Sequence, residues 1–172
     1  IIIVYTNMCE SNNNKDFVHL HCHSHYSVQD ALPSPEKLVL GAKSKGFSAI
    51  AITDHGKMGA HVEFADTAHK SGLKPILGCE FYLAKDRRDK SGDIKGDFSD
   101  IVTENADACI PKKGREKLAH LTVLAQNQEG YKNILQLVYE ASNPDCYWYF
   151  PRIDFDYLAK YNKGLIVLSG CL

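Results

Sequence analysis

The sequence has almost no net charge, because 20 Lys and Arg residues balance 21 Asp and Glu residues. A balanced total gives no electrostatic case for a nucleic-acid or membrane partner, although a local charged patch is compatible with either. Long apolar runs are also lacking. The opening stretch IIIVYTNM is too short to span a bilayer and has neither the basic start nor the cleavage pattern of a signal peptide. We therefore expect no membrane partner.

Paired cysteines are lacking as well, since the six cysteines are scattered and include no CxxC motif. A disulfide scaffold is normally shorter and denser in cysteine, so we expect reduced thiols and a cytoplasmic location. The 172 residues suffice for one compact domain with a sizeable core.

Histidine, in contrast, is concentrated in one short stretch. The segment FVHLHCHSHYSVQD, residues 17–30, holds four of the chain's eight histidines, at every second position from His19 to His25. Alternate residues of a strand share one face, so a strand here would place four imidazoles on one side. Such a face makes a poor core and indicates a binding function.

Strand and helix patterns alternate along the chain. The expected strands are 17–23, 48–53, 74–84, 118–126 and 163–172, and the expected helices are 34–46, 57–72, 127–142 and 154–161. This order predicts an α/β fold of parallel strands with crossover helices, either a barrel or an open sheet. Residues 1–16 read as a variable lead and 85–117 as a surface insertion. Because the sequence stops after strand five with no covering helix, we expect 17–172 to be the N-terminal portion of a longer unit.

Potential metal ligands recur at the ends of the predicted strands, where parallel α/β folds bind their ligands. The residues concerned are His21, His23, Asp30, Asp54, His55, Glu80, His120 and Cys171. Taken singly, His120 could be a core histidine, Asp54 a turn cap and Cys171 core filler. Their conjunction on every strand predicts a shared metal site. His61 and His69, on the second helix, are expected on the surface or in a groove.

Imidazole, carboxylate and a thiolate suit zinc, manganese or iron better than calcium or magnesium. More than four ligands implies two or three divalent ions, an arrangement suited to the hydrolysis of phosphate esters. Glu80, central among the strands, is the predicted bridging carboxylate. With Glu80, we predict that His55 and Asp30 take part in catalysis.

These residues resemble the signature of the polymerase and histidinol phosphatase (PHP) superfamily. The matching motifs are His21-Cys22-His23, Asp30, Thr53-Asp54-His55, Gly78-Cys79-Glu80 and His120. The stretches AITDHGKMGAHVEF, GLKPILGCEFYLA, HLTVLAQNQEGYKNILQLV and GLIVLSGCL are similar to the PHP domain that opens the alpha subunit of bacterial C-family replicative DNA polymerases.

The resemblance implies a distorted (β/α)7 barrel, here truncated after about five strands, with up to three metals held by nine ligands. Seven of these ligands are present, namely His21, His23, Asp30, His55, Glu80, His120 and Cys171. An Asp-x-His pair would supply the last two beyond Leu172. The resemblance also implies that His19 and Asp54 orient neighbouring ligands.

Three functions fit this resemblance. In the first, the parent protein is a DNA-directed DNA polymerase (a nucleotidyltransferase), and this segment is a metal-dependent phosphoesterase acting as a 3′–5′ proofreading exonuclease. Its partners would be the DNA primer 3′ end, the sliding clamp and an exonuclease subunit. The second is a free-standing phosphatase acting on a small phosphomonoester. The third is a non-catalytic metal-bound scaffold.

Overall fold

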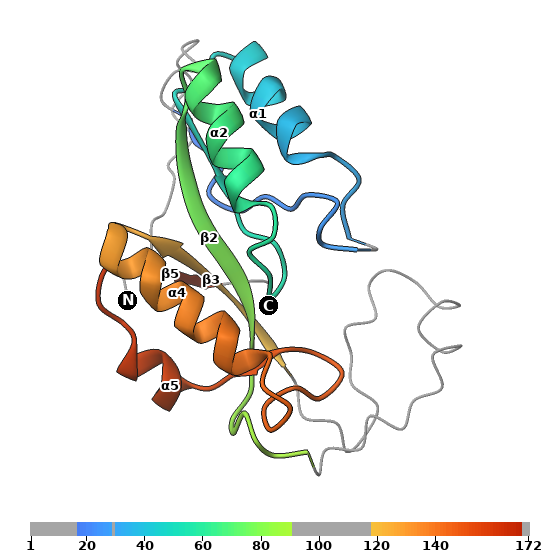
Figure 1. Cartoon of the computed structure of the whole chain (residues 1–172), viewed down its shortest axis with the longest axis vertical. Coiled ribbons are helices and arrows are strands. Elements are labelled where there is room, and N and C mark those ends of the chain that lie inside the picture. Colours follow the sequence, from blue (N-terminus) through green and yellow to red (C-terminus); the bar gives the residue numbers. More distant parts are fainter. Residues whose placement is uncertain (1–16, 29, 91–117, 170–172) are drawn as a thin grey trace.

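The computed structural model describes residues 17–28, 30–90 and 118–169, which form a mixed α/β arrangement (Figure 1). Its helices are α1 (Pro35–Ser44), α2 (His61–Ser71), α4 (Gln128–Ala141) and α5 (Phe155–Lys160). Its strands are β1 (Ala49–Ile52), β2 (Lys74–Leu83), β3 (Ala119–Ala125), β4 (Arg152–Ile153) and β5 (Leu165–Ser169). The predicted lead, most of the 85–117 insertion and Cys171 lie outside the described residues.

Within the described ranges, no helix is both long and apolar enough to cross a membrane.

Side-chain caps define the starts of three helices at the predicted places. Ser34 accepts a hydrogen bond from the Lys37 N–H at the start of α1, and Pro35 occupies the first helical position. Asn127 accepts from the Gly130 N–H at α4, and Asp154 accepts from the Tyr157 N–H at α5. Such caps satisfy backbone donors that the first helical turn leaves unpaired.

The sheet order is β1-β2-β3-β5, with β4 added beside β2. Strand β1 pairs parallel to β2, but β2 with β3 and β3 with β5 pair antiparallel. The expectation of uniformly parallel strands was therefore wrong. Leu83 at the end of β2 pairs with Ala119 at the start of β3, so the chain returns to the sheet at the edge where it left and does not cross over.

The predicted first strand is also absent, since residues 17–23 run extended without forming a regular ladder. The segment lies beside β1, where the Ala51 N–H donates to the His19 carbonyl at 2.9 Å and the Thr53 N–H donates to the Cys22 carbonyl at 2.8 Å. The Thr53 hydroxyl bonds to the same residue, Cys22, through both its N–H and its carbonyl. These few bonds hold the histidine-rich segment against the sheet.

Two apolar clusters surround the sheet. One joins α1 and α2 to β1 through Val39, Ile52 and Phe64, and the other joins α4 to β2 and β3. On β2, Phe81 is fully buried in the second cluster, and its neighbours Glu80 and Tyr82 point to the other face. One side of β2 thus builds the core and the other side carries polar groups.

Gly130 in α4 packs against the backbone of Gly164, just before β5. A Cβ added to Gly130 would lie 1.8 Å from the Gly164 carbonyl oxygen. Gly41 in α1, in contrast, has no neighbouring atom within 4 Å of the corresponding position. The two glycines therefore offer a matched test of this packing.

We predict that Gly130→Ala lowers the free energy of unfolding by about 3 kcal/mol or more, because backbone overlap outweighs the gain in helix propensity. Gly41→Ala should raise it by about 1 kcal/mol, since alanine is the better helix former. Urea unfolding of both variants measures the difference. Equal effects of the two substitutions would contradict the packing of α4 against residue 164.

Candidate metal centre

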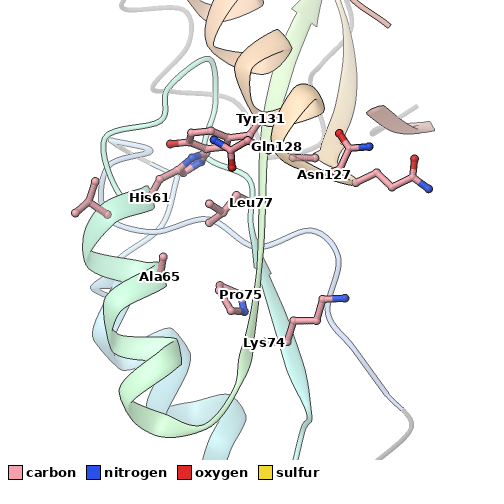
Figure 2. A pocket seen from close by; sticks show the side chains of 11 residues that line it. His61, Ala65, Lys74, Pro75, Leu77, Asn127, Gln128 and Tyr131 are labelled. Atoms are coloured by element: carbon pink, nitrogen blue, oxygen red, sulfur yellow. The ribbon is translucent and has the colours of Figure 1, made fainter. Parts of the chain in front are cut away.

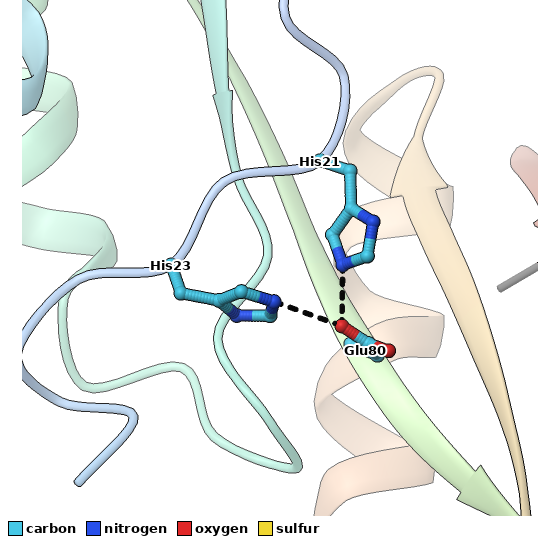
Figure 3. Close-up of side chains that lie close together, drawn as sticks. All are labelled: His21, His23 and Glu80. Atoms are coloured by element: carbon cyan, nitrogen blue, oxygen red, sulfur yellow. Dashed lines mark hydrogen bonds and ion pairs between the residues drawn. The ribbon is translucent and has the colours of Figure 1, made fainter. Parts of the chain in front are cut away.

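The candidate site forms around the carboxylate of Glu80, whose side chain is 1% exposed. Its Oε2 contacts the Nε2 atom of His21 and lies 3.0 Å from the Nε2 atom of His23. Figure 3 shows both imidazoles, carried by the extended segment, pointing at the carboxylate on β2. Of the four alternating histidines, the middle pair, His21 and His23, thus points at the Glu80 carboxylate.

His120 reaches the other carboxylate oxygen from the neighbouring strand. It lies opposite Tyr82 in the β2–β3 register, two residues beyond Glu80, and so on the same face of the sheet. Its Nδ1 atom is 3.0 Å from Glu80 Oε1. Because β3 is antiparallel, a residue at its start lies at the edge where β2 ends.

His55 and Asp30 complete the cluster. The backbone of His55 runs alongside Glu80 as a single bridge beyond β1, where the Gly56 N–H donates to the Glu80 carbonyl at 2.8 Å. This pairing leaves His55 Nε2 3.8 Å from Glu80 Oε2 and 2.9 Å from Asp30 Oδ2. The side chain of Asp30 is 46% exposed, so this edge of the cluster opens to solvent.

Asp54 is fully buried and organises the loop that carries the histidines. Its carboxylate accepts hydrogen bonds from the backbone N–H and the hydroxyl of Ser24, at 2.6 and 2.8 Å, and from the hydroxyl of Ser27 at 2.8 Å. The Ser27 oxygen in turn accepts from the His55 N–H at 3.1 Å. Asp54, which the resemblance predicts to orient neighbouring ligands, is thus linked to this loop and to His55 through two serines.

Ser27 also lies beside the ring of His23. Its hydroxyl donates to Asp54, because a carboxylate can only accept. The Ser27 oxygen is 3.4 Å from the His23 Nδ1 atom. A proton on Nδ1 would donate to that oxygen and leave the Nε2 lone pair free to bind a cation. His23 Nε2 and Glu80 Oε2 lie 3.0 Å apart, a distance that suits either a proton on Nε2 or a cation shared by the two ligands.

The cluster fits divalent ions in its spacing and donor types. Three overlapping groups have all their ligand atoms within 4.8 Å of one another, namely His21-His23-Glu80, His23-Asp30-His55 and His55-Glu80-His120. Ligands at zinc distances in a tetrahedral array lie about 3.4 Å apart. Several pairs here lie 2.9 to 3.9 Å apart. Glu80 belongs to two of these groups. Its Oε2 atom faces the imidazoles of His21, His23 and His55, and its Oε1 atom faces that of His120.

Charge compensation within the cluster is strong. Burial alone would raise the pKa of Glu80, but hydrogen bonds from His120, His21 and His23 outweigh it and lower that pKa. The hydrogen bond with Glu80 raises the pKa of His21. The pKa of His55 is lowered, chiefly because burial disfavours its charged form. A carboxylate that stays ionised beside a neutral His55 suits metal binding, which protonation of either ligand would oppose.

The remaining predicted residues lie apart from the cluster. His19 is exposed, and its ring packs against Phe17 and Phe47, with centroid distances of 4.7 and 5.5 Å. These contacts give it no role in orienting a ligand, so we leave it out of the proposed site. Cys171 lies outside the described residues.

A separate hollow of about 420 Å³ lies between α2 and the start of α4 (Figure 2). His61 lines it, as expected for a groove residue, but is itself buried and bonds through Nε2 to the Gly78 carbonyl. None of the candidate ligands lines this hollow. His69 is exposed on α2, as predicted.

Sequence reasoning missed Ser24, Ser27 and Tyr82. The two serines follow the His-Cys-His motif closely, but their contact with Asp54 depends on a loop conformation that no local pattern encodes. Tyr82 had a detectable signal, because it lies two residues after Glu80 and therefore on the same face of β2. Its ring stacks on His55 at a centroid distance of 5.4 Å.

Comparisons with known proteins agree with the motif-based assignment. A family model described as PHP domain matches residues 19–172. A DNA polymerase III subunit alpha of Chlamydia pneumoniae is 39% identical over 158 residues, which cover 91% of this chain and 11% of that protein. A DNA polymerase III subunit alpha of Treponema pallidum is 40% identical over 157 residues, covering 91% and 12%. The chain thus spans 11 to 12% of the length of these relatives.

Two solved structures align weakly. An amidohydrolase from Chromobacterium violaceum has a TM-score of 0.41 and 14% identity, over 84% of this chain and 48% of that one. A provisionally assigned metal-dependent phosphoesterase from Bifidobacterium adolescentis has a TM-score of 0.40 and 18% identity, over 72% and 33%.

We predict that Ser27→Ala weakens metal binding by about 10- to 100-fold, the usual cost of removing a group that orients a ligand. Competition with a chromogenic zinc chelator measures the affinity. Ser44→Ala is the matched control, because Ser44 is an exposed serine whose hydroxyl donates to the Gly41 carbonyl within α1. Equal affinities of the two variants would contradict the proposed role of Ser27.

Proposed function

This chain belongs to the PHP domain family, and we propose that it is a metal-dependent phosphoesterase unit that hydrolyses phosphodiester bonds at the 3′ end of DNA. The observation that carries the proposal is the convergence of four imidazoles on the buried Glu80 carboxylate. A buried carboxylate needs a partner, but one hydrogen-bonded imidazole would meet that need. Four imidazoles exceed that need, and several imidazoles around one carboxylate are typical of a site for divalent cations.

In this proposal, His21 and His23 would hold one ion, His55 and His120 would hold another, and Glu80 would contribute to both sites. Bound divalent ions would supply a hydroxide nucleophile near neutral pH and neutralise charge on the phosphoryl oxygens. Asp54, acting through Ser27, would favour a proton on Nδ1 of His23 and so leave the Nε2 lone pair for an ion.

Substrate would enter from the exposed side of the cluster. The side chains of Asp30 and His21 are 46% and 42% exposed, whereas that of Glu80 is buried. An extended phosphodiester can therefore approach along this edge without displacing the protein core. Asp30 is placed at 2.9 Å from His55 Nε2, where it can either hold an ion or accept a proton.

We further propose that the parent protein is a DNA-directed DNA polymerase of the C family, located in the cytoplasm, in which this segment is the N-terminal part of a distorted (β/α)7 barrel. Its proposed partners are the primer 3′ end, the sliding clamp and an exonuclease subunit. The names of the matched relatives support this context. Cys171 remains a proposed ligand, as does an Asp-x-His pair beyond Leu172.

The test is trimming of a mismatched primer 3′ end by the complete protein, loaded with manganese or zinc. We predict that combining His21→Ala with Glu80→Ala reduces the trimming rate by about 100-fold or more, because both ligand and bridge are removed. His69→Ala is the matched control, since it removes an exposed histidine of α2 that has no place in the cluster.

Trimming that is unchanged in the double variant would overturn the nuclease proposal. Tight metal binding that is lost in the double variant, together with no trimming by the unsubstituted protein, would identify a metal-bound scaffold instead. If elemental analysis finds no bound metal, both the nuclease function and the metal-bound scaffold are overturned.

A further inference from the structure

An aromatic path leads out of the candidate metal centre. The ring of Tyr82 stacks on His55 at 5.4 Å with an interplanar angle of 23°, and meets His120 edge-on at 5.0 Å. Tyr82 also contacts Phe150, with ring centroids 4.6 Å apart and an interplanar angle of 32°. A continuous set of rings thus connects two proposed metal ligands with a loop outside the cluster.

The outer end of this path is a loop of four consecutive aromatic residues, 147–150, between α4 and β4. Three of them are large and exposed, with Tyr147, Tyr149 and Phe150 at 49, 41 and 41%. Burying such rings contributes substantially to stability, so their exposure beside a polar site suggests a ligand-binding surface. We call Tyr82, Tyr149 and Phe150 the aromatic shelf.

The backbone conformation at Tyr149 supports a binding role for this loop. Tyr149 has a φ of 60°, in the left-handed region that side chains other than glycine rarely adopt. It lies between Trp148 and Phe150, which pair with each other through a hydrogen bond from the Trp148 N–H to the Phe150 carbonyl. Strain of this kind persists where the surrounding structure imposes it, and it occurs often at binding sites.

Two contacts fix the base of the loop and its place beside the metal centre. The buried guanidinium of Arg152 donates to the Cys146 carbonyl and closes the base of the loop. The ring of Pro151 occupies the space beside Gly56, where an added Cβ would lie 2.3 Å from Pro151 Cγ. Gly56 directly follows His55, so the loop is seated against the segment that carries a proposed ligand.

The chemistry of the shelf favours a nucleobase. Residues 147–151 contain no charged side chain, so they offer neither an ion pair nor a repulsive field to a phosphate ester. They offer flat ring faces, on which any base stacks with little regard to sequence. A base stacked on the shelf would be joined through its sugar to a phosphate near the cluster. An exonuclease that removes any terminal nucleotide needs such a base site, because it must hold the end without recognising its sequence.

We propose that the aromatic shelf stacks a nucleobase next to the scissile phosphodiester and so selects single-stranded nucleic-acid ends as substrates. This inference rests on the proposed phosphodiesterase function and adds to it a base-binding subsite. Phe150 is assigned as a binding residue, because it is exposed and its ring contacts that of Tyr82.

The first experiment compares two single-stranded oligonucleotides in the complete protein, one ending in an ordinary 3′ nucleotide and one ending in an abasic residue. We expect the unsubstituted protein to prefer the base-bearing end by about tenfold in kcat/KM, the effect of one stacked base. Phe150→Leu should reduce that preference to near one, because it keeps an apolar side chain but removes the ring. Phe150→Tyr should retain the preference.

A second readout does not depend on cleavage. Stacking quenches the fluorescence of a 3′-terminal 2-aminopurine, which is measured in EDTA so that no hydrolysis occurs. We expect Phe150→Leu to lose at least half of the quenching found with the unsubstituted protein. Tyr139→Leu is the matched control, since Tyr139 is a 71% exposed aromatic residue on α4 outside the shelf.

The outcomes separate the shelf from the nuclease proposal. If neither oligonucleotide is trimmed by the unsubstituted protein, the nuclease function fails, and the fluorescence measurement still tests the shelf. If trimming is normal but Phe150→Leu changes neither the preference nor the quenching, the shelf is overturned and the nuclease function stands. A lowered melting temperature with unchanged quenching would also overturn the shelf, by showing that Phe150 packs against another part of the protein.

Discussion

The buried carboxylate of Glu80 is the constraint on which the rest of the site depends. A charge placed in the interior of a sheet must be compensated, and here the compensation comes from four imidazoles on three separate segments. Because the two carboxylate oxygens face different histidines, one residue determines how all of them converge. The alternation on β2 then explains the layout, since Phe81 enters the core while Glu80 and Tyr82 face the site.

The antiparallel pairing of β3 explains why His120, at the start of its strand, lies close to residues at the ends of other elements. In a wholly parallel sheet, the start of one strand lies far from the end of its neighbour. Because β3 runs against β2, His120 at its beginning lies opposite Tyr82, near the end of β2. The loop of aromatic residues reaches the same edge, since β4 pairs with β2 at Tyr82.

Local signals predicted most of the elements, although not β4 and not the absence of a strand at 17–23, and they predicted most of the residues in the cluster. Long-range geometry was not accessible from the sequence. Caps such as Ser34 and Asp154 located helix starts correctly, because they act within one turn. The candidate ligands were found by residue type at strand ends. Strand direction was mispredicted, because alternating strands and helices are also compatible with antiparallel returns. The contacts of Asp54 with two serines were missed, because they join segments about thirty residues apart in a loop conformation that periodicity does not encode.

Bound ions can be located by anomalous X-ray diffraction from crystals of the metal-loaded complete protein. We predict at least two anomalous peaks flanking the Glu80 carboxylate, one beside His21 and His23 and one beside His55 and His120. Replacing Glu80 by glutamine should remove or separate the peaks while the surrounding fold remains. Histidines bonded directly to Glu80, with no anomalous density at saturating zinc or manganese, would show that the cluster is not a metal centre.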